Sequence, residues 1–98
     1  MIRHIVMWKF KDGEEENVNA FLTSLAALSG EMDIIKKAEV GRNTAPGSNY
    51  DAVLISEFES FEDLETYKND PRHKKVSSLC KAIRVDRCAV DYEIETGN

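Results

Sequence analysis

The sequence predicts an α+β fold in which four antiparallel strands form one sheet and helices cover one of its faces. Apolar side chains alternate along residues 2–10, 50–58 and 85–94, as they do in β-strands. After residue 12 and again after residue 60, apolar side chains instead recur three and four positions apart, which is typical of helices. A more polar strand at 34–42 completes the order β-α-β-β-α-β. With right-handed crossovers, this order is the ferredoxin-like plan.

The first strand, residues 2–10, carries apolar side chains on both of its faces. A strand of this kind is expected to be covered on both sides, whereas the helices cover only one face of the sheet. We therefore expect the other face to pack against a second copy of the chain, with two-fold symmetry. One face consists of Ile2, His4, Val6, Trp8 and Phe10, and the other consists of Arg3, Ile5, Met7 and Lys9.

The first helix is expected to begin at Asp12, which can cap it, with Glu15 at the capping-box position. Gly30 is expected to end this helix in the left-handed conformation. Residues 43–49 are rich in Asn, Pro and Gly, and they predict a loop between the two middle strands. The apolar stripe of the helix consists of Val18, Phe21, Leu22, Leu25 and Ala26.

The second helical segment contains two start signals. Ser60 can cap a short helix, with Asp63 at the capping-box position. Asp70 and Pro71 then mark a second start, because Asp caps helices and Pro fits their first turn. His73 falls on the apolar stripe that follows. The inner side of the whole segment is expected to consist of Phe61, Leu64, Tyr67, Val76, Leu79, Cys80 and Ile83.

Composition limits the size and the partners of the protein. The 98 residues suit one domain, 1–98, without room for a second core. A net charge of −5 argues against nucleic-acid binding, which needs a dominant basic face. No apolar run exceeds four residues, so neither a membrane span nor a secretory leader is expected. Two cysteines, Cys80 and Cys88, fit neither a disulfide framework nor a zinc site, which favours reduced thiols in the cytoplasm.

Charge is distributed unevenly over the second half of the chain. Residues 57–70 have a net charge of −5, and residues 72–87 have a net charge of +5. Two interpretations remain open. Either the two segments are simply solvated helix faces, or their charges create an electrostatic field that attracts an anionic ligand or a complementary subunit.

Four segments recur in an order that resembles the stress-responsive A/B barrel domain family, also called Dabb, from about residue 2 to residue 94. This resemblance implies a dimeric α+β barrel, and it implies no single function. The segments are His4-Ile5-Val6-Met7-Trp8-Lys9-Phe10-Lys11, Glu39-Val40-Gly41-Arg42-Asn43, Phe58-x-Ser60-x-Glu62-x-Leu64-x-x-Tyr67-x-x-x-Pro71-x-His73, and Ala89-Val90-Asp91-Tyr92.

The family includes a plant polyketide cyclase that performs an intramolecular aldol step without a cofactor. Its working Tyr and His stand in the same Tyr-x-x-x-Pro-x-His arrangement, so the resemblance carries these roles to Tyr67 and His73, and a pocket-lining role to His4. The present chain departs from that enzyme at two pocket positions, where it has Asp70 instead of His and Arg84 instead of Trp. Trp8 also replaces a smaller aliphatic residue. The polyketide substrate is therefore not implied.

These residues leave several functions open. The first is a homodimer of unassigned biochemical role that binds a small apolar or anionic ligand in a pocket formed by His4, Val6, Trp8, Tyr67 and His73. The alternative is a cofactor-independent cyclase-like or isomerase-like enzyme, with His73 as general base and Tyr67 as its partner. The third possibility is a purely structural role. Tyr67 and His73 would then satisfy each other's hydrogen-bonding groups, and the dimer would serve as a scaffold for another protein. No metal site is expected, because the histidines and carboxylates lack ligand spacing.

Overall fold

The computed structural model describes residues 1–47 and 49–95, and within them the elements follow the predicted order. The second helical segment is divided at Pro71 into two helices. The elements are β1 (Ile2–Phe10), α1 (Glu15–Glu31), β2 (Lys37–Arg42), β3 (Ala52–Phe58), α2 (Phe61–Asn69), α3 (Pro71–Ile83) and β4 (Arg84–Glu93).

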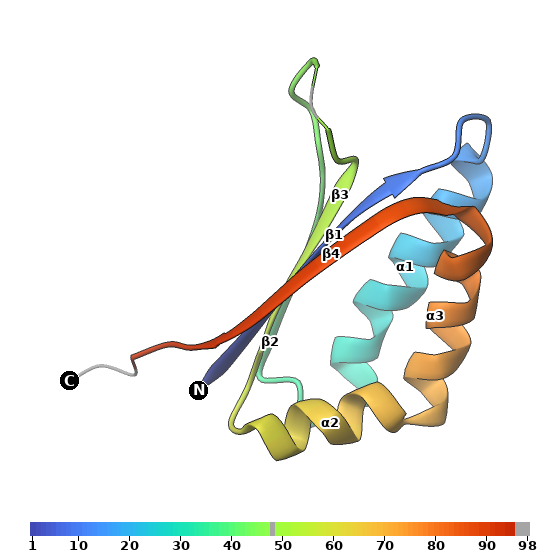
Figure 1. Ribbon diagram of the computed structural model, residues 1–98. Coiled ribbons are helices and arrows are strands. Elements are labelled where there is room, and N and C mark those ends of the chain that lie inside the picture. The colour runs from blue at the N-terminus through green and yellow to red at the C-terminus, as the bar shows by residue number, and fades with distance from the viewer. Residues whose placement is uncertain (48, 96–98) are drawn as a thin grey trace.

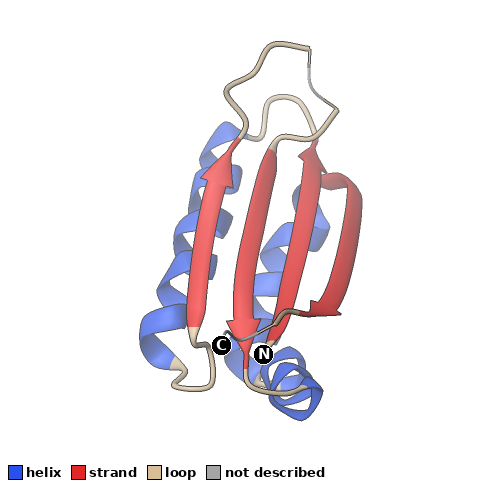
Figure 2. Cartoon of the chain, turned by 90° about the vertical axis from the view of Figure 1, so that its left-hand side faces the viewer, coloured by secondary structure: helices blue, strands red, loops and turns tan. Residues whose placement is uncertain are grey.

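The strands form one antiparallel sheet in the order β2-β3-β1-β4, which confirms the ferredoxin-like fold. All three helices lie on one side of the sheet (Figure 1). Figure 2 views the sheet from its other side, which none of α1, α2 and α3 covers. No helix of the described chain is long and apolar enough to cross a membrane. The molecule therefore has two layers, with its core between sheet and helices.

The core confirms the alternation predicted for β1, because residues 2, 4, 6, 8 and 10 are all buried. Trp8 packs edge-on against Phe21 of α1, with 5.2 Å between the ring centroids. The stripe of α1 is confirmed except at Ala26, which is exposed, while Leu28 is buried in its place. The stripe therefore stays centred on the sheet along the whole helix.

The ends of α1 differ from the prediction. Glu14 is the N-cap, without a side-chain hydrogen bond, so the proposed cap at Asp12 is wrong. Gly13, with φ of 79°, forms the left-handed turn that leads from β1 into the helix. Gly30 does not end the helix, which continues to Glu31 because the next residue, Met32, is buried in the core.

The caps of α2 and α3 are confirmed. The Ser60 hydroxyl accepts a hydrogen bond from the Asp63 amide at 3.1 Å, and Asp70 accepts one from the Arg72 amide at 2.8 Å. The inner positions predicted for Phe61 and Leu79 are wrong, because their side chains are 54% and 43% exposed. Leu79 instead lines a groove on the outer side of α1 and α3.

The two middle strands start later than predicted, at Lys37 and Ala52 rather than at residues 34 and 50. Ile34 and Ile35 contact the core from an irregular segment before β2, which explains their apolar character. The loop predicted at 43–49 is confirmed, except that Ser48 lies outside the described residues.

The uncovered face of the sheet is apolar at its centre. Ile5 of β1 lies between Ile55 of β3 and Val90 of β4. Val90 is 54% exposed in the protomer. Towards one end of this face, Arg3 forms an ion pair with Glu57 at 3.1 Å. The centre of this face is therefore apolar and open to solvent in the protomer.

Candidate functional site

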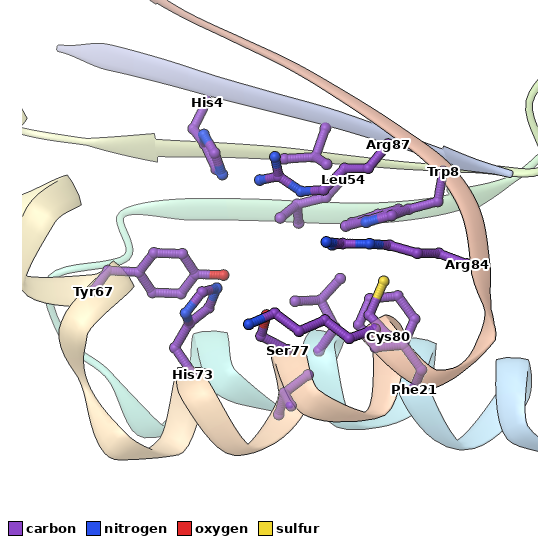
Figure 3. Close-up of a pocket in the computed structure, with 14 residues that line it drawn as sticks. His4, Trp8, Phe21, Leu54, Tyr67, His73, Ser77, Cys80, Arg84 and Arg87 are labelled. Carbon is purple, nitrogen blue, oxygen red and sulfur yellow. The ribbon is translucent and has the colours of Figure 1, made fainter. Parts of the chain in front are cut away.

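A cavity of about 220 Å³ lies between the sheet and the helices. All five residues predicted to form a pocket line it, and Trp8 forms one wall without filling the space (Figure 3). Leu79 does not reach it. The lining residues are His4, Val6, Trp8, Phe21, Leu25, Leu54, Tyr67, His73, Val76, Ser77, Cys80, Lys81, Arg84 and Arg87.

The break between α2 and α3 brings Tyr67 and His73 together. Tyr67 lies in the last turn of α2, and His73 lies in the first turn of α3, after the cap at Asp70 and Pro71. Their ring centroids are 4.4 Å apart. His4 approaches from β1, with its ring centroid 6.4 Å from that of Tyr67. Three polar rings from three elements therefore meet at one end of the cavity.

His73 is arranged as a neutral base. Its Nδ1 lies 3.1 Å from the carbonyl oxygen of Lys68. Because a carbonyl only accepts, Nδ1 must carry the proton, and the neutral ring then keeps a lone pair on Nε2. Burial lowers the pKa of His73 below its ordinary value, and the charge of Arg87 lowers it further, although the Lys68 carbonyl and Asp70 oppose the shift. The ring is therefore unprotonated near neutral pH.

His4 is arranged in the same way. Its Nδ1 donates a hydrogen bond to Asp91 of β4, which lies opposite it in the sheet. Burial lowers the pKa of His4, and Asp91 only partly opposes this effect. Burial by itself would raise the pKa of Asp91, but His4 and Lys68, whose Nζ is 3.6 Å away, bring it below its ordinary value. The pair is therefore a neutral imidazole oriented by a carboxylate.

Tyr67 supplies a hydroxyl donor at the same end of the cavity. Burial raises its pKa to about 12, although Arg87 opposes the shift. Its hydroxyl points into the cavity (Figure 3), and no hydrogen bond joins it to another described residue. The group therefore stays protonated at neutral pH and is available to a ligand.

From β4, sequence reasoning named only Arg84 as a pocket position, through the resemblance, and did not assign Asp91 or Arg87 to the site. This strand places Asp91 opposite His4 and Arg87 opposite Trp8, with both side chains facing the helices. Arg84 also faces the cavity. The signal was present in the positive charge of residues 72–87, but only the pairing of β4 with β1 shows which of these charges face inward.

Cys80, by contrast, is not poised for reaction, since burial raises the pKa of its thiol while Arg84 opposes the shift. Within residues 1–47 and 49–95, no group of three or more His, Cys, Asp or Glu side chains is placed to hold a metal ion.

Comparison with known proteins identifies relatives over almost the whole chain. The profile of the "Stress responsive A/B Barrel Domain" family matches residues 2–94. The stress-response A/B barrel domain-containing protein DABB1 of Arabidopsis thaliana is 28% identical over 97% of this chain. The chain spans about half the length of that relative, 48%.

Among the solved structures of the same fold, some belong to proteins of unknown function and others to named enzymes. A dimeric protein of unknown function from Bacteroides fragilis is 33% identical, covers 95% of each chain and has a TM-score of 0.86. A hydroxynitrile lyase from Passiflora edulis is 16% identical, covers 99% of this chain and 95% of its own, and has a TM-score of 0.85. The second likeness shows the fold alone.

Proposed function

Because the chain belongs to the stress-responsive A/B barrel domain family, we propose that it is a single domain, residues 1–98, that binds a small, largely apolar molecule between its helices and its sheet. The size of the cavity supports this proposal. An apolar cavity of about 150 Å³ accommodates benzene, and the present one measures about 220 Å³. A ring with a short substituent therefore fits it.

The observation that carries the proposal is the state of the polar groups in the cavity. A Tyr and a His with a purely structural role would be expected to satisfy each other by hydrogen bonding. Here the Tyr67 and His73 rings pack together at 4.4 Å, but no hydrogen bond joins them in the described structure. Their hydroxyl and Nε2 groups are left for a molecule that enters the cavity.

A variant that fills the cavity tests binding directly. Ser77 lines the cavity, so Ser77→Leu should block it, whereas Ser78→Leu changes an exposed neighbour on the same helix. With phenylacetone as the probe, we expect NMR titration to show binding by the wild type and by Ser78→Leu. Binding should be lost in Ser77→Leu. Equal binding by both variants would place the probe elsewhere and contradict the proposal.

Cofactor-independent proton transfer is the second candidate function, and the tautomer of His73 favours it. Nε2 of His73 would take a proton from the carbon next to a carbonyl group, and the C–H electron pair would pass into an enolate. The Tyr67 hydroxyl would donate a hydrogen bond to the enolate oxygen. The proton would then return to the same or another carbon. Enolate formation is shared by isomerisation and aldol cyclisation; in the latter the enolate carbon attacks a second carbonyl group, and the proton goes to the alkoxide that forms.

Deuterium exchange separates an enzyme from a binding protein. Phenylacetone in D₂O should exchange its α-protons faster with the protein than with buffer, and His73→Asn should abolish the difference. Tyr67→Phe should slow exchange by about tenfold or more, since it removes one oxyanion donor. If exchange stays at the buffer rate while the probe binds, the enzyme hypothesis fails and the binding proposal stands.

We further propose that the protein is a homodimer joined through the uncovered face of the sheet, and that it resides in the cytoplasm. The similar protein from Bacteroides fragilis is described as dimeric. The centre of the uncovered face is apolar, as an interface core requires. Cys80 and Cys88 are both free thiols, which suits a reducing compartment.

A further inference from the structure

Three cations gather where α3 and β4 border the cavity. Lys81 lies near the end of α3, and Arg84 and Arg87 lie on β4. Figure 3 shows the guanidinium groups of Arg84 and Arg87 turned towards the cavity, that of Arg84 beside Trp8 and that of Arg87 between His4 and Trp8. Arg87 and Lys81 are exposed and mark the open side, whereas Arg84 is half-buried. The cavity therefore has a positively charged entrance.

Within residues 1–47 and 49–95, no acidic side chain pairs with these three cations. Asp86, between the two arginines in sequence, lies on the opposite face of the sheet and accepts a hydrogen bond from Tyr50 at 3.0 Å. Asp91 shares the inner face but is already bound by His4 and Lys68.

Arg84 is half-buried and Arg87 is exposed, and neither guanidinium group has a carboxylate partner among the described residues, so both keep N–H donors for an anion. A guanidinium group has a planar set of donors that matches a carboxylate, and its bonds to an anion are roughly twice as strong as neutral ones. An anion that enters the cavity would supply the missing partner.

We propose that the cavity takes a small apolar molecule carrying a carboxylate, which is bound by Arg84 and Arg87. This inference rests on the proposed ligand-binding function and names the class of ligand. The hydrocarbon part would lie against Trp8, Leu54 and Val76. The volume of about 220 Å³ admits roughly nine non-hydrogen atoms, given that about 150 Å³ holds the six of benzene.

This orientation also determines which part of the ligand meets the acid–base groups. Figure 3 shows Tyr67 and His73 at one end of the cavity and Arg84 near Trp8 at the other. A carboxylate held between Arg84 and Arg87, on the Trp8 side of His4, would direct the opposite end of the molecule towards the Tyr67 hydroxyl and Nε2 of His73. Arg84 and Arg87 are therefore specificity-determining residues, whereas Lys81 attracts the anion at the rim.

Phenylacetate and its neutral isostere phenylacetamide test the inference, because they differ in charge and hardly in shape. Calorimetric titration should show that the wild type binds phenylacetate at least about tenfold more tightly than phenylacetamide, a ratio typical of one charged hydrogen bond. Added salt should weaken the binding of phenylacetate and leave that of the amide unchanged.

Charge-matched variants show whether the two arginines are responsible. Arg84→Gln and Arg87→Gln should each weaken the binding of phenylacetate by about tenfold and leave that of phenylacetamide nearly unchanged. Lys74→Gln removes one positive charge from an exposed position of α3 that does not line the cavity, and it should bind like the wild type. Circular dichroism confirms that each variant is folded.

The outcomes separate the inference from the function on which it rests. If phenylacetamide binds as tightly as phenylacetate, the carboxylate assignment is overturned while ligand binding stands. If Lys74→Gln weakens binding as much as the arginine variants, the effect is one of net charge and the assignment to Arg84 and Arg87 is wrong. If neither compound binds, both the assignment and the proposed function fail.

Discussion

At the scale of single residues, the two histidines share one arrangement. In each ring Nδ1 faces an oxygen, supplied by Lys68 for His73 and by Asp91 for His4. Both Nε2 atoms are thus left as acceptors in neutral rings. Such second partners orient an imidazole and select its tautomer, as they do in catalytic sites. The carboxylate of Asp91 is therefore a positioning group within the candidate site.

The lowered pKa values of His4 and His73 predict that acid destabilises the protein. Both rings ordinarily titrate near 6.5. Because their pKa values are lower in the folded chain, the unfolded chain binds more protons below that pH. The free energy of unfolding should therefore fall as the pH decreases from about 7.5 to about 5.5. Urea unfolding at several pH values measures this dependence.

A histidine variant provides the control for this prediction. His73→Gln removes one of the two rings, so the free energy of unfolding should depend less steeply on pH than in the wild type. Protonation of Asp91 should reduce the stability further only at more acidic pH, below the ordinary pKa of this carboxyl group, 3.8. Stability that stays constant or rises on acidification would contradict the assigned neutral rings.

At the scale of secondary-structure elements, the junction of α2 and α3 builds the site. Each helix has its own capping residue, and the short connection holds Tyr67 and His73 side by side. Arg72 lowers the pKa of Asp70 to about 2, so the cap of α3 stays charged over most of the pH range. The geometry of the site therefore depends on two local capping interactions that the sequence alone predicts.

Loss of the α2 cap should weaken the fold. Ser60→Ala removes the hydroxyl that accepts the Asp63 amide, which should lower the free energy of unfolding by about 1 kcal/mol. Thr66→Ala is the matched control, because Thr66 lies in the middle of the same helix and its hydroxyl only bonds to the Glu62 carbonyl. Denaturant titration should give Ser60→Ala a clearly lower free energy of unfolding than Thr66→Ala. Equal free energies of unfolding would contradict a capping role.

At the scale of the whole molecule, the sheet separates two surfaces of different character. Its inner face and the helices enclose the cavity. Its outer face is uncovered by these helices (Figure 2) and is apolar at its centre, where Ile5 lies between Ile55 and Val90. Both Ile5 and Met7 belong to β1, the strand whose inner side forms the floor of the cavity. An interface on the outer face would thus stiffen the strand that carries His4 and Trp8.

A charge on the outer face should prevent dimer formation. Val90→Lys places an ammonium group at a position that is 54% exposed in the protomer, so the chain should fold but the interface would bury an unpaired charge. Leu79→Lys is the control, because Leu79 is 43% exposed on the helical side. Light scattering should give twice the monomer mass for the wild type and Leu79→Lys, and the monomer mass for Val90→Lys.

Either of two results would argue against this interface. A monomeric wild type at micromolar concentration would leave the apolar face without the partner that its composition suggests. A dimeric Val90→Lys together with a monomeric Leu79→Lys would move the contact to the helical side of the molecule.

The sequence by itself determined the features that depend on neighbouring residues. The alternation in β1, the stripe of α1 and the caps at Ser60 and Asp70 each involve residues a few positions apart, so they can be read along the chain. The motif around Tyr67 and His73 is equally local. It located one end of the cavity before any tertiary contact was known.

Only the tertiary structure decided which distant side chains share the cavity. The contact between His4 and Asp91, and the inward position of Arg87, depend on how β4 pairs with β1 across the whole length of the chain. A shift of one residue in that pairing would turn these side chains to the other face. The position of Leu79 likewise depends on tertiary packing. Helical spacing predicted it on the inner side, but the packing of α3 against α1 leaves it outside the core. Local periodicity determines which side chains share one face of a helix or strand. Long-range packing determines which other residues that face contacts.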